Sequence, residues 1–136
     1  MRTLYIGVMS GTSLDGVDAV LVDTAEGFHC LAHVALPMPP TLRQDFLQLN
    51  QSGPNELHLA ALSSNALVAL YTQAVQSLLR TTNNQAQAIA AIGAHGQTVR
   101  HQPQLHDGVG YTLQLNNPAL LAEQTGIKVV ADFRSR

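Results

Sequence analysis

Short apolar segments alternate with turn-forming residues at the N-terminus, and this pattern constrains the fold more than any other feature of the chain. Leu4–Met9, Val17–Asp23 and Phe28–Leu36 have the composition and length of β-strands. The Asp-Gly pair at 15–16 and the turn residues at 24–27 separate them closely enough for two hairpins. The pattern therefore predicts a three-stranded antiparallel meander. Apolar residues at both odd and even positions of Val17–Asp23 predict a strand that is covered on both faces.

The rest of the chain alternates helical and strand patterns. Prolines at 37, 39 and 40 end the meander, and Thr41 is the expected N-cap of the helix that follows. We expect helices over 42–50, 56–80 and 118–124, and strands over 88–94, 111–115 and 127–131. The Gly-, His- and Pro-rich stretch between 94 and 111 is interpreted as a loop. This order predicts an α/β fold with a mixed sheet and helices on its faces.

Composition excludes several classes of protein. A length of 136 residues fits one domain, and seven basic against nine acidic residues provide no positive field for nucleic acid. Leu57 to Leu79 carries no charged residue, but its Ser, Thr, Asn, Gln and His side chains argue against a membrane helix. A single cysteine, Cys30, fits a reducing, cytoplasmic compartment. Only 12% of residues are charged, which suggests a surface covered by more protein, including a possible homodimer.

The link between the first two strands is the first candidate site. Residues 10–18 combine two glycines, three hydroxyl side chains and two carboxylates, Asp15 and Asp18. Glycines let backbone N–H groups approach an anion closely, and a carboxylate can hold a hydrated Mg²⁺. The segment is neither a Walker A loop nor a dinucleotide-binding fingerprint. An ordinary hairpin with Asp-Gly in its turn remains the alternative.

Two further candidates follow predicted buried strands, where ligands bind in open α/β sheets. His95, Gln97 and Thr98 offer donors and acceptors that suit a polyhydroxylated ligand. Asp132 and Arg134 place an acid and a base after the last strand. The alternatives are loop packing for the first group and a simple ion pair for the second.

Three motifs together resemble one family. Ile6–Leu21, Ala91–His101 and Thr125–Arg134 are similar, in this order, to three signatures of the anhydro-N-acetylmuramic acid kinases. The resemblance implies a ribonuclease H-like (actin-like ATPase) lobe of a two-lobed kinase that holds ATP between its lobes. It also implies a reaction in peptidoglycan recycling that hydrolyses the 1,6-anhydro bond of the sugar and phosphorylates its 6-oxygen.

The resemblance also implies roles for individual residues. The ATP-binding segment would comprise Gly11, Thr12, Ser13, Leu14, Asp15, Gly16, Val17 and Asp18. Within it, Asp15 would hold Mg²⁺. Contacts to the sugar would come from His95, Gln97, Thr98, Asp132 and Arg134.

The family is much longer than this chain, so we expect residues 1–136 to be the N-terminal lobe, mostly or wholly, of such a kinase. The general base that activates water is expected beyond Arg136, and the isolated chain is expected to be inactive. The competing interpretation is a non-catalytic actin-like or chaperone-like ATPase, or a binding module of the same superfamily. The hairpin alone would permit it, whereas the His95–Thr98 segment with Asp132 and Arg134 favours a small-sugar site.

Overall fold

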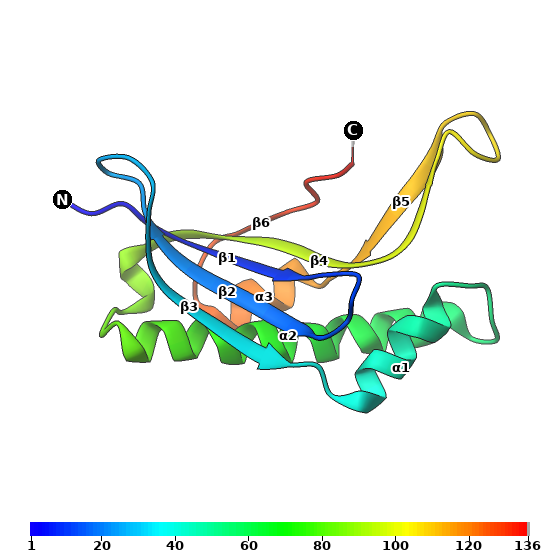
Figure 1. Cartoon of the computed structure of the whole chain (residues 1–136), viewed down its shortest axis with the longest axis horizontal. Helices are drawn as coiled ribbons and strands as arrows, with labels where there is room; N and C mark the ends of the chain where they lie inside the picture. Colours follow the sequence, from blue (N-terminus) through cyan, green and yellow to red (C-terminus); the bar gives the residue numbers. More distant parts are fainter. Residues whose placement is uncertain (136) are drawn as a thin grey trace.

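A six-stranded mixed sheet with three α-helices forms the fold (Figure 1). The computed structural model describes residues 1–135. The strands are β1 (Leu4–Ser10), β2 (Gly16–Asp23), β3 (His29–Pro37), β4 (Ile89–Pro103), β5 (Gly110–Leu115) and β6 (Val129–Ala131). The helices are α1 (Pro40–Leu49), α2 (Glu56–Thr81) and α3 (Pro118–Thr125), with a 3₁₀ turn, η1, over Ala86–Ala88.

The sheet has the order β3-β2-β1-β4-β5, and β6 pairs with β4. β1, β2 and β3 are antiparallel neighbours, which confirms the predicted meander. β1, β4 and β6 run parallel to one another, whereas β5 is antiparallel to β4. The mixed α/β architecture predicted from the sequence is therefore confirmed.

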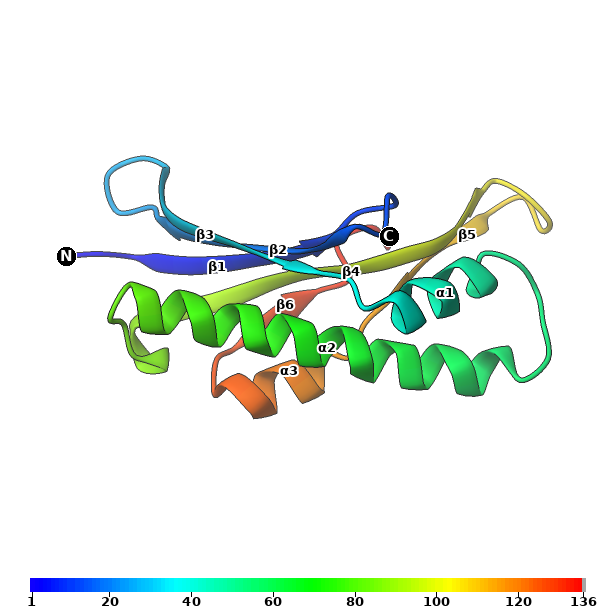
Figure 2. The ribbon, with the colours of Figure 1, turned by 60° about the horizontal axis from the view of Figure 1, so that its bottom comes forward.

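All three α-helices lie on the same side of the sheet (Figure 2). On β1, the side chains of Leu4, Ile6 and Val8 are buried on this side, whereas Tyr5 and Met9 project to the opposite side and are exposed. The helices thus cover one face of the sheet. The prediction that helices would lie on both faces is wrong for residues 1–135.

The apolar residues at consecutive positions of β2 lie on opposite faces of the sheet. β2 keeps an unbroken register with β1, so Leu21 shares the helix-covered face with Ile6, and Val20 and Val22 lie on the other face. The register shift in the β2–β3 ladder comes from one extra residue in β3, Leu31. Helices cover only one face of β2 (Figure 2), whereas on the other face Val22 is buried and Val20 is half-buried.

β4 is much longer than predicted and takes in residues 95–103 of the stretch interpreted as a loop, whereas residues 104–109 do form a loop before β5. Its first half pairs with β1 and β6, and its second half pairs with β5. The junction between the halves is irregular, because the register with β1 shifts between Val8 and Ser10. Gly96 supplies a φ of +81° at this junction, a conformation that glycine adopts readily. The glycine that suggested a loop is thus part of a bulge within a strand.

The helix ends are only partly as predicted. α1 begins at Pro40 with Pro39 as its N-cap and no side-chain cap, so the assignment of Thr41 as the cap is wrong. α3 is capped by Asn117, whose side chain accepts from the Leu120 N–H, and it ends at Gly126 with a left-handed φ of 71°. Across residues 1–135, none of the helices combines the length and the apolar character needed to cross a membrane.

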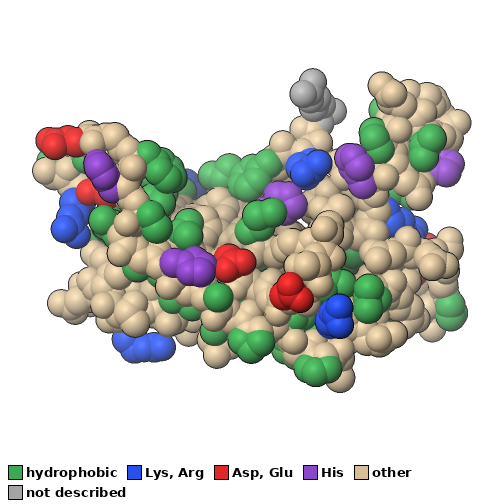
Figure 3. All heavy atoms as spheres, viewed as in Figure 1, with side chains coloured by type: hydrophobic (Ala, Val, Ile, Leu, Met, Phe, Trp, Pro, Cys, Tyr) green, Lys and Arg blue, Asp and Glu red, His purple; other side chains and the backbone are tan. Residues whose placement is uncertain are grey.

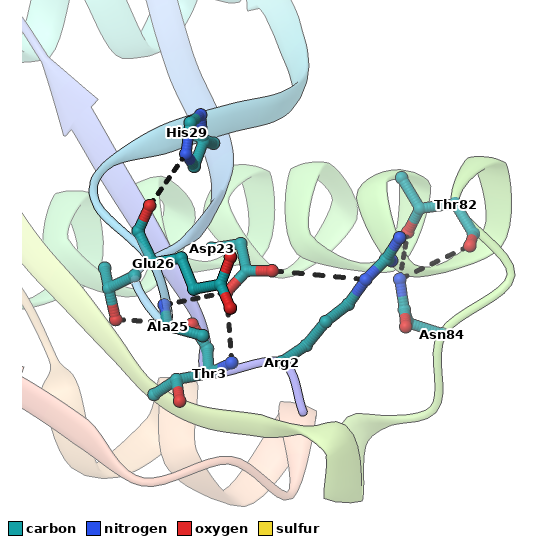
Figure 4. Close-up of polar contacts among 9 residues, drawn as sticks. Arg2, Thr3, Asp23, Ala25, Glu26, His29, Thr82 and Asn84 are labelled. Carbon is teal, nitrogen blue, oxygen red and sulfur yellow. Dashed lines mark hydrogen bonds and ion pairs between the residues drawn. The ribbon is translucent and has the colours of Figure 1, made fainter.

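Asp23, the last residue of β2, forms hydrogen bonds to two other parts of the chain (Figure 4). Its Oδ1 accepts hydrogen bonds from the backbone N–H groups of Ala25 (3.0 Å) and Thr3 (3.1 Å). These two bonds, with a smaller contribution from the Arg2 guanidinium, lower the pKa of Asp23 below its ordinary value. Asp23 therefore closes the β2–β3 turn and fixes the entry into β1.

Candidate functional site

The candidate residues converge because three parallel strands reach the same edge of the sheet. In the β1–β4 ladder Ser10 is opposite Gln97, and in the β4–β6 ladder Ala94 is opposite Ala131. Residues that follow β1 and β6 are therefore separated by about two strand spacings, roughly 10 Å. Ligands of open α/β sheets bind beyond the carboxyl ends of such strands.

The hairpin after β1 is a rigid turn anchored in the core. The Leu14 N–H donates to the Gly11 carbonyl (3.1 Å), and the Met38 N–H donates to the Asp15 carbonyl (3.0 Å). Leu14 has a φ of 58°, and its side chain is buried, as is that of Val17. These two residues could contact a ligand only through their backbone, while their side chains hold the turn in place.

Most residues of the hairpin line a cavity of about 490 Å³. Its lining comprises Met9, Gly11, Ser13, Asp15, Gly16, Val17, Asp18, Ala35, Leu36 and Pro37. Most of the predicted ATP-binding segment therefore borders one space. The structure also adds the end of β3 to this wall. No local pattern in the sequence indicates this contact, because it depends on the pairing of β2 with β3.

The two carboxylates of the hairpin are not equivalent. Asp18 Oδ1 lies 2.9 Å from His33 Nε2 on the neighbouring strand, and both side chains are exposed. Among residues 1–135, no side chain or backbone group bonds to the Asp15 carboxylate. Asp15 is thus the carboxylate at this cavity that is available to a cation, and an oxygen ligand of this kind suits Mg²⁺.

A second cavity, of about 300 Å³, brings together three of the predicted sugar contacts: His95, Asp132 and Arg134. His95 Nδ1 lies 2.9 Å from the Gly96 carbonyl oxygen. Asp132 has a φ of 65° and accepts a hydrogen bond from Ser135 Oγ. In the part of the chain that the structure describes, Asp132 and Arg134 form no ion pair, so that alternative is not supported.

Gln97 and Thr98 lie outside this cavity. The Gln97 side chain is fully buried, and its Nε2 donates to the carbonyls of Gly11 (3.2 Å) and Thr98 (3.1 Å). The expectation that Gln97 contacts the sugar is therefore corrected, because its amide is enclosed by protein. Thr98 is half-buried, and its Oγ1 accepts from Gln114 Nε2 (3.1 Å).

The structure adds residues that the sequence analysis did not single out. Asn116 lines the second cavity and donates from Nδ2 to the Ala94 carbonyl (3.2 Å), and Phe133 lies over Gly93. At residues 116–118 the sequence predicted only a helix from residue 118 onward. The position of Asn116 beside His95 depends on the pairing of β5 with β4, which no local pattern reveals.

Comparison with known proteins gives one consistent result. A family model described as anhydro-N-acetylmuramic acid kinase matches residues 3–136. The chain is 63% identical over 138 residues to the anhydro-N-acetylmuramic acid kinase of Albidiferax ferrireducens, covering 100% of this chain and 35% of that protein. For the kinase of the same name from Bordetella petrii, identity is 61% over 135 residues, covering 98% of this chain and 35% of the relative. The chain thus spans about a third of the length of these relatives.

Proposed function

Because the chain belongs to the anhydro-N-acetylmuramic acid kinase family, we propose that it contributes the N-terminal part of such a kinase. The proposed reaction opens the 1,6-anhydro bond of anhydro-N-acetylmuramic acid with water and transfers a phosphoryl group from ATP to the 6-oxygen. Family membership over residues 3–136 is the observation that carries this proposal. The grouping of the candidate residues around two cavities supports it.

We propose further that residues 1–136 form most or all of one lobe with a ribonuclease H-like, actin-like fold. An antiparallel meander followed by parallel strands that are reached through helices supports this assignment. The relatives are nearly three times as long as the matched segment, which leaves room for a second lobe. A cytoplasmic location, where ATP is present, and a homodimer belong to the same proposal.

The hairpin is the proposed site for the ATP phosphates. Ser13 and Gly11 border its cavity, so a hydroxyl group and a backbone without a side chain in the way are available to phosphate oxygens. Asp15 is the residue that would hold Mg²⁺, which neutralises phosphate charge when it is bound. The Leu14 side chain, buried in the core, keeps the turn in a fixed position, and phosphoryl transfer depends mainly on such positioning.

The cavity beside His95 is the proposed site for the sugar. Asp132 and Asn116 can accept and donate hydrogen bonds to hydroxyl and amide groups, and Arg134 can pair with the sugar's carboxylate. Phe133 offers an apolar surface in the same wall. We place the general base that activates water in the part of the kinase that the relatives have beyond the matched segment.

A chimeric kinase tests the proposal. In it, residues 1–136 replace the matching segment of the Albidiferax ferrireducens kinase, to which the chain is 63% identical. We expect ADP release that requires Mg²⁺ and anhydro-N-acetylmuramic acid together, with a phosphorylated sugar as product. ADP release that does not depend on the sugar would favour an actin-like or chaperone-like ATPase instead. A folded chimera that releases no ADP would refute the proposed function.

A further inference from the structure

We propose that Gln97 is a positioning residue that orients the backbone of the phosphate-binding hairpin, so that a free N–H group is directed toward the bound nucleotide. This inference rests on the proposed function, because it assigns a task to a residue within that site. It differs from the sequence-based expectation, in which Gln97 contacts the sugar directly.

The bulge in β4 turns Gln97 into the core. Buried residues alternate along β1 up to Ser10, so Ser10 faces the helices. Between the Val8–Ala94 pair and the Ser10–Gln97 pair, β4 contains one residue more than β1. This extra residue brings Gln97 to the same side as Ser10, although unbroken alternation from Ala94 would place it on the open face.

The buried side-chain amide of Gln97 makes hydrogen bonds through its oxygen and through both of its N–H hydrogens. Gln97 Oε1 accepts from Ser10 Oγ, and both hydrogens of Nε2 have acceptors, the carbonyls of Gly11 and Thr98. A buried amide with all of its hydrogen bonds made is costly to displace, and it specifies one local geometry. Gln97 therefore connects the end of β1, the first residue of the hairpin and β4.

The bond to the Gly11 carbonyl fixes the orientation of a whole peptide group. This oxygen also accepts from the Leu14 N–H, so two donors hold it on the inner side of the turn. No peptide bond in the described chain is cis, and in a planar trans peptide the N–H points opposite to the C=O. The Thr12 N–H therefore points outward from the hairpin, where Thr12 is exposed.

The outward N–H is a candidate phosphate donor. Within residues 1–135 no group accepts a hydrogen bond from the Thr12 N–H, and its neighbours Gly11 and Ser13 line the 490 Å³ cavity. Outward-facing N–H groups of a turn bind anions because their partial positive charges converge. Without Gln97 the Gly11 peptide can rotate, and the N–H loses its fixed direction.

Kinetic measurements on the chimera test this role. Gln97→Met removes the three hydrogen bonds and should raise the KM for Mg·ATP about tenfold, with a smaller fall in kcat. Ser10→Ala keeps the bond to Gly11 and should change the KM much less. Gln124→Met removes a similar hydroxyl–amide contact, with Thr72 (2.8 Å), between α2 and α3, and should leave the KM unchanged.

A second control separates positioning from stability. Leu121→Ala empties a fully buried position in α3 and should lower the melting temperature without changing the KM for Mg·ATP. An unchanged KM and kcat in Gln97→Met, combined with a lower melting temperature, would overturn the inference, because Gln97 would then be only structural. If Gln97→Met does not fold, Gln97→Asn takes its place. It keeps the amide but shortens the side chain by one methylene, so the amide no longer reaches the Gly11 carbonyl.

A spectroscopic measurement keeps the inference testable without turnover. In the chimera labelled with nitrogen-15 threonine, Mg·ADP should shift the Thr12 amide resonance in the unsubstituted protein and shift it far less in Gln97→Met. Equal shifts in both proteins, or no shift in the unsubstituted protein, would overturn the inference. Absence of sugar-dependent turnover with the expected shifts would refute only the proposed reaction.

Discussion

Gly96 and Gly108 both have left-handed backbone conformations, with φ values of +81° and +88°, but their surroundings differ. A Cβ on Gly96 would lie 2.5 Å from the Leu115 carbonyl oxygen, whereas nothing lies within 4 Å of a Cβ on Gly108. Substitution at both positions strains the backbone, and only at Gly96 does it also create a collision with backbone. Glycine at 96 is therefore required by the junction between the two halves of β4.

We expect Gly96→Ala to lower the free energy of unfolding by about 3 kcal/mol or more, and Gly108→Ala by only about 1 kcal/mol. Urea unfolding of the chimeric kinase and of both variants, followed by circular dichroism, measures the difference. Equal losses would show that the contact with Leu115 is relieved by a movement of β5.

Asp15 and Asp18 differ in whether their carboxylates have a partner within the protein, and this decides which of them we expect to bind Mg²⁺. Asp18 is adjacent to His33, whereas Asp15 is exposed at the cavity with no partner in residues 1–135. In the chimera, Asp15→Asn should raise the Mg²⁺ concentration needed for half-maximal activity about tenfold or more, because a cation ligand is lost. The exposed carboxylate of Glu26, in the β2–β3 turn, provides the matched control as Glu26→Gln. An identical Mg²⁺ dependence in Asp15→Asn and the unsubstituted chimera would exclude Asp15 as a ligand.

At the scale of elements, Arg100 connects β4 to the segment between α1 and α2. Its guanidinium donates to the carbonyls of Leu49 (3.1 Å) and Gln51 (2.8 Å) and to the carboxylate of Glu56 (2.6 Å). The end of α1, the connecting loop and the start of α2 are thus held against one strand. The hydrogen bond from Arg100 is the main reason that the pKa of Glu56 is lowered from its ordinary value.

This link predicts a dependence of stability on pH. Because the pKa of Glu56 is lower in the folded state, its stabilising effect is complete above the unfolded-state pKa and is lost as pH falls through the folded-state pKa. Glu56→Gln should therefore lower the melting temperature of the chimera at neutral pH, and the difference should shrink as the solution is acidified below about pH 4. Glu123→Gln, which changes an exposed carboxylate of α3, should give no such pH-dependent difference. A constant difference for Glu56→Gln from neutral to acidic pH would contradict the prediction.

At the scale of the whole molecule, one face of the sheet carries no helix in residues 1–135 (Figure 2). Tyr5, Met9, Val130 and Phe133 are between 39% and 53% exposed. Figure 3 shows hydrophobic side chains scattered among charged and His side chains on the side of the molecule that it presents. We expect an apolar surface of this kind to be covered by other protein. Under the proposed function, the second lobe or a second copy of the chain would cover it.

We expect residues 1–136, produced alone, to self-associate and to bind a hydrophobic dye through this face. The double variant Tyr5→Lys with Val130→Lys should reduce both effects, because it places two charges on the open face. Leu57→Lys introduces a charge at an 86% exposed leucine of α2 and should reduce them less. Sedimentation velocity and dye fluorescence measure the two effects. Monomeric behaviour of the unsubstituted polypeptide at high concentration would contradict this prediction.

The amino-acid sequence by itself determined most of the elements and where the chemistry could lie. Turn residues and short apolar segments identified the meander, and helical periodicity identified α2 to within one residue at its end. α3 begins at Pro118, as predicted, and ends one residue after the predicted end at 124. These signals are local, since caps, turns and apolar spacing act over a few neighbouring residues. The three motifs were likewise sufficient to recognise the family that the comparisons show.

Only the tertiary structure decided which way the important side chains face. The bulge at Gly96 turned Gln97 from an expected ligand contact into a buried link, and pairing with β3 placed His33 beside Asp18. Pairing with β5 extended β4 to Pro103, through the first part of the stretch that was interpreted as a loop. Register and bulges depend on strands far apart in the chain, and a shift of one residue moves a side chain to the opposite face. For that reason residue types predicted the candidate site, whereas the roles within it depend on how the strands are paired.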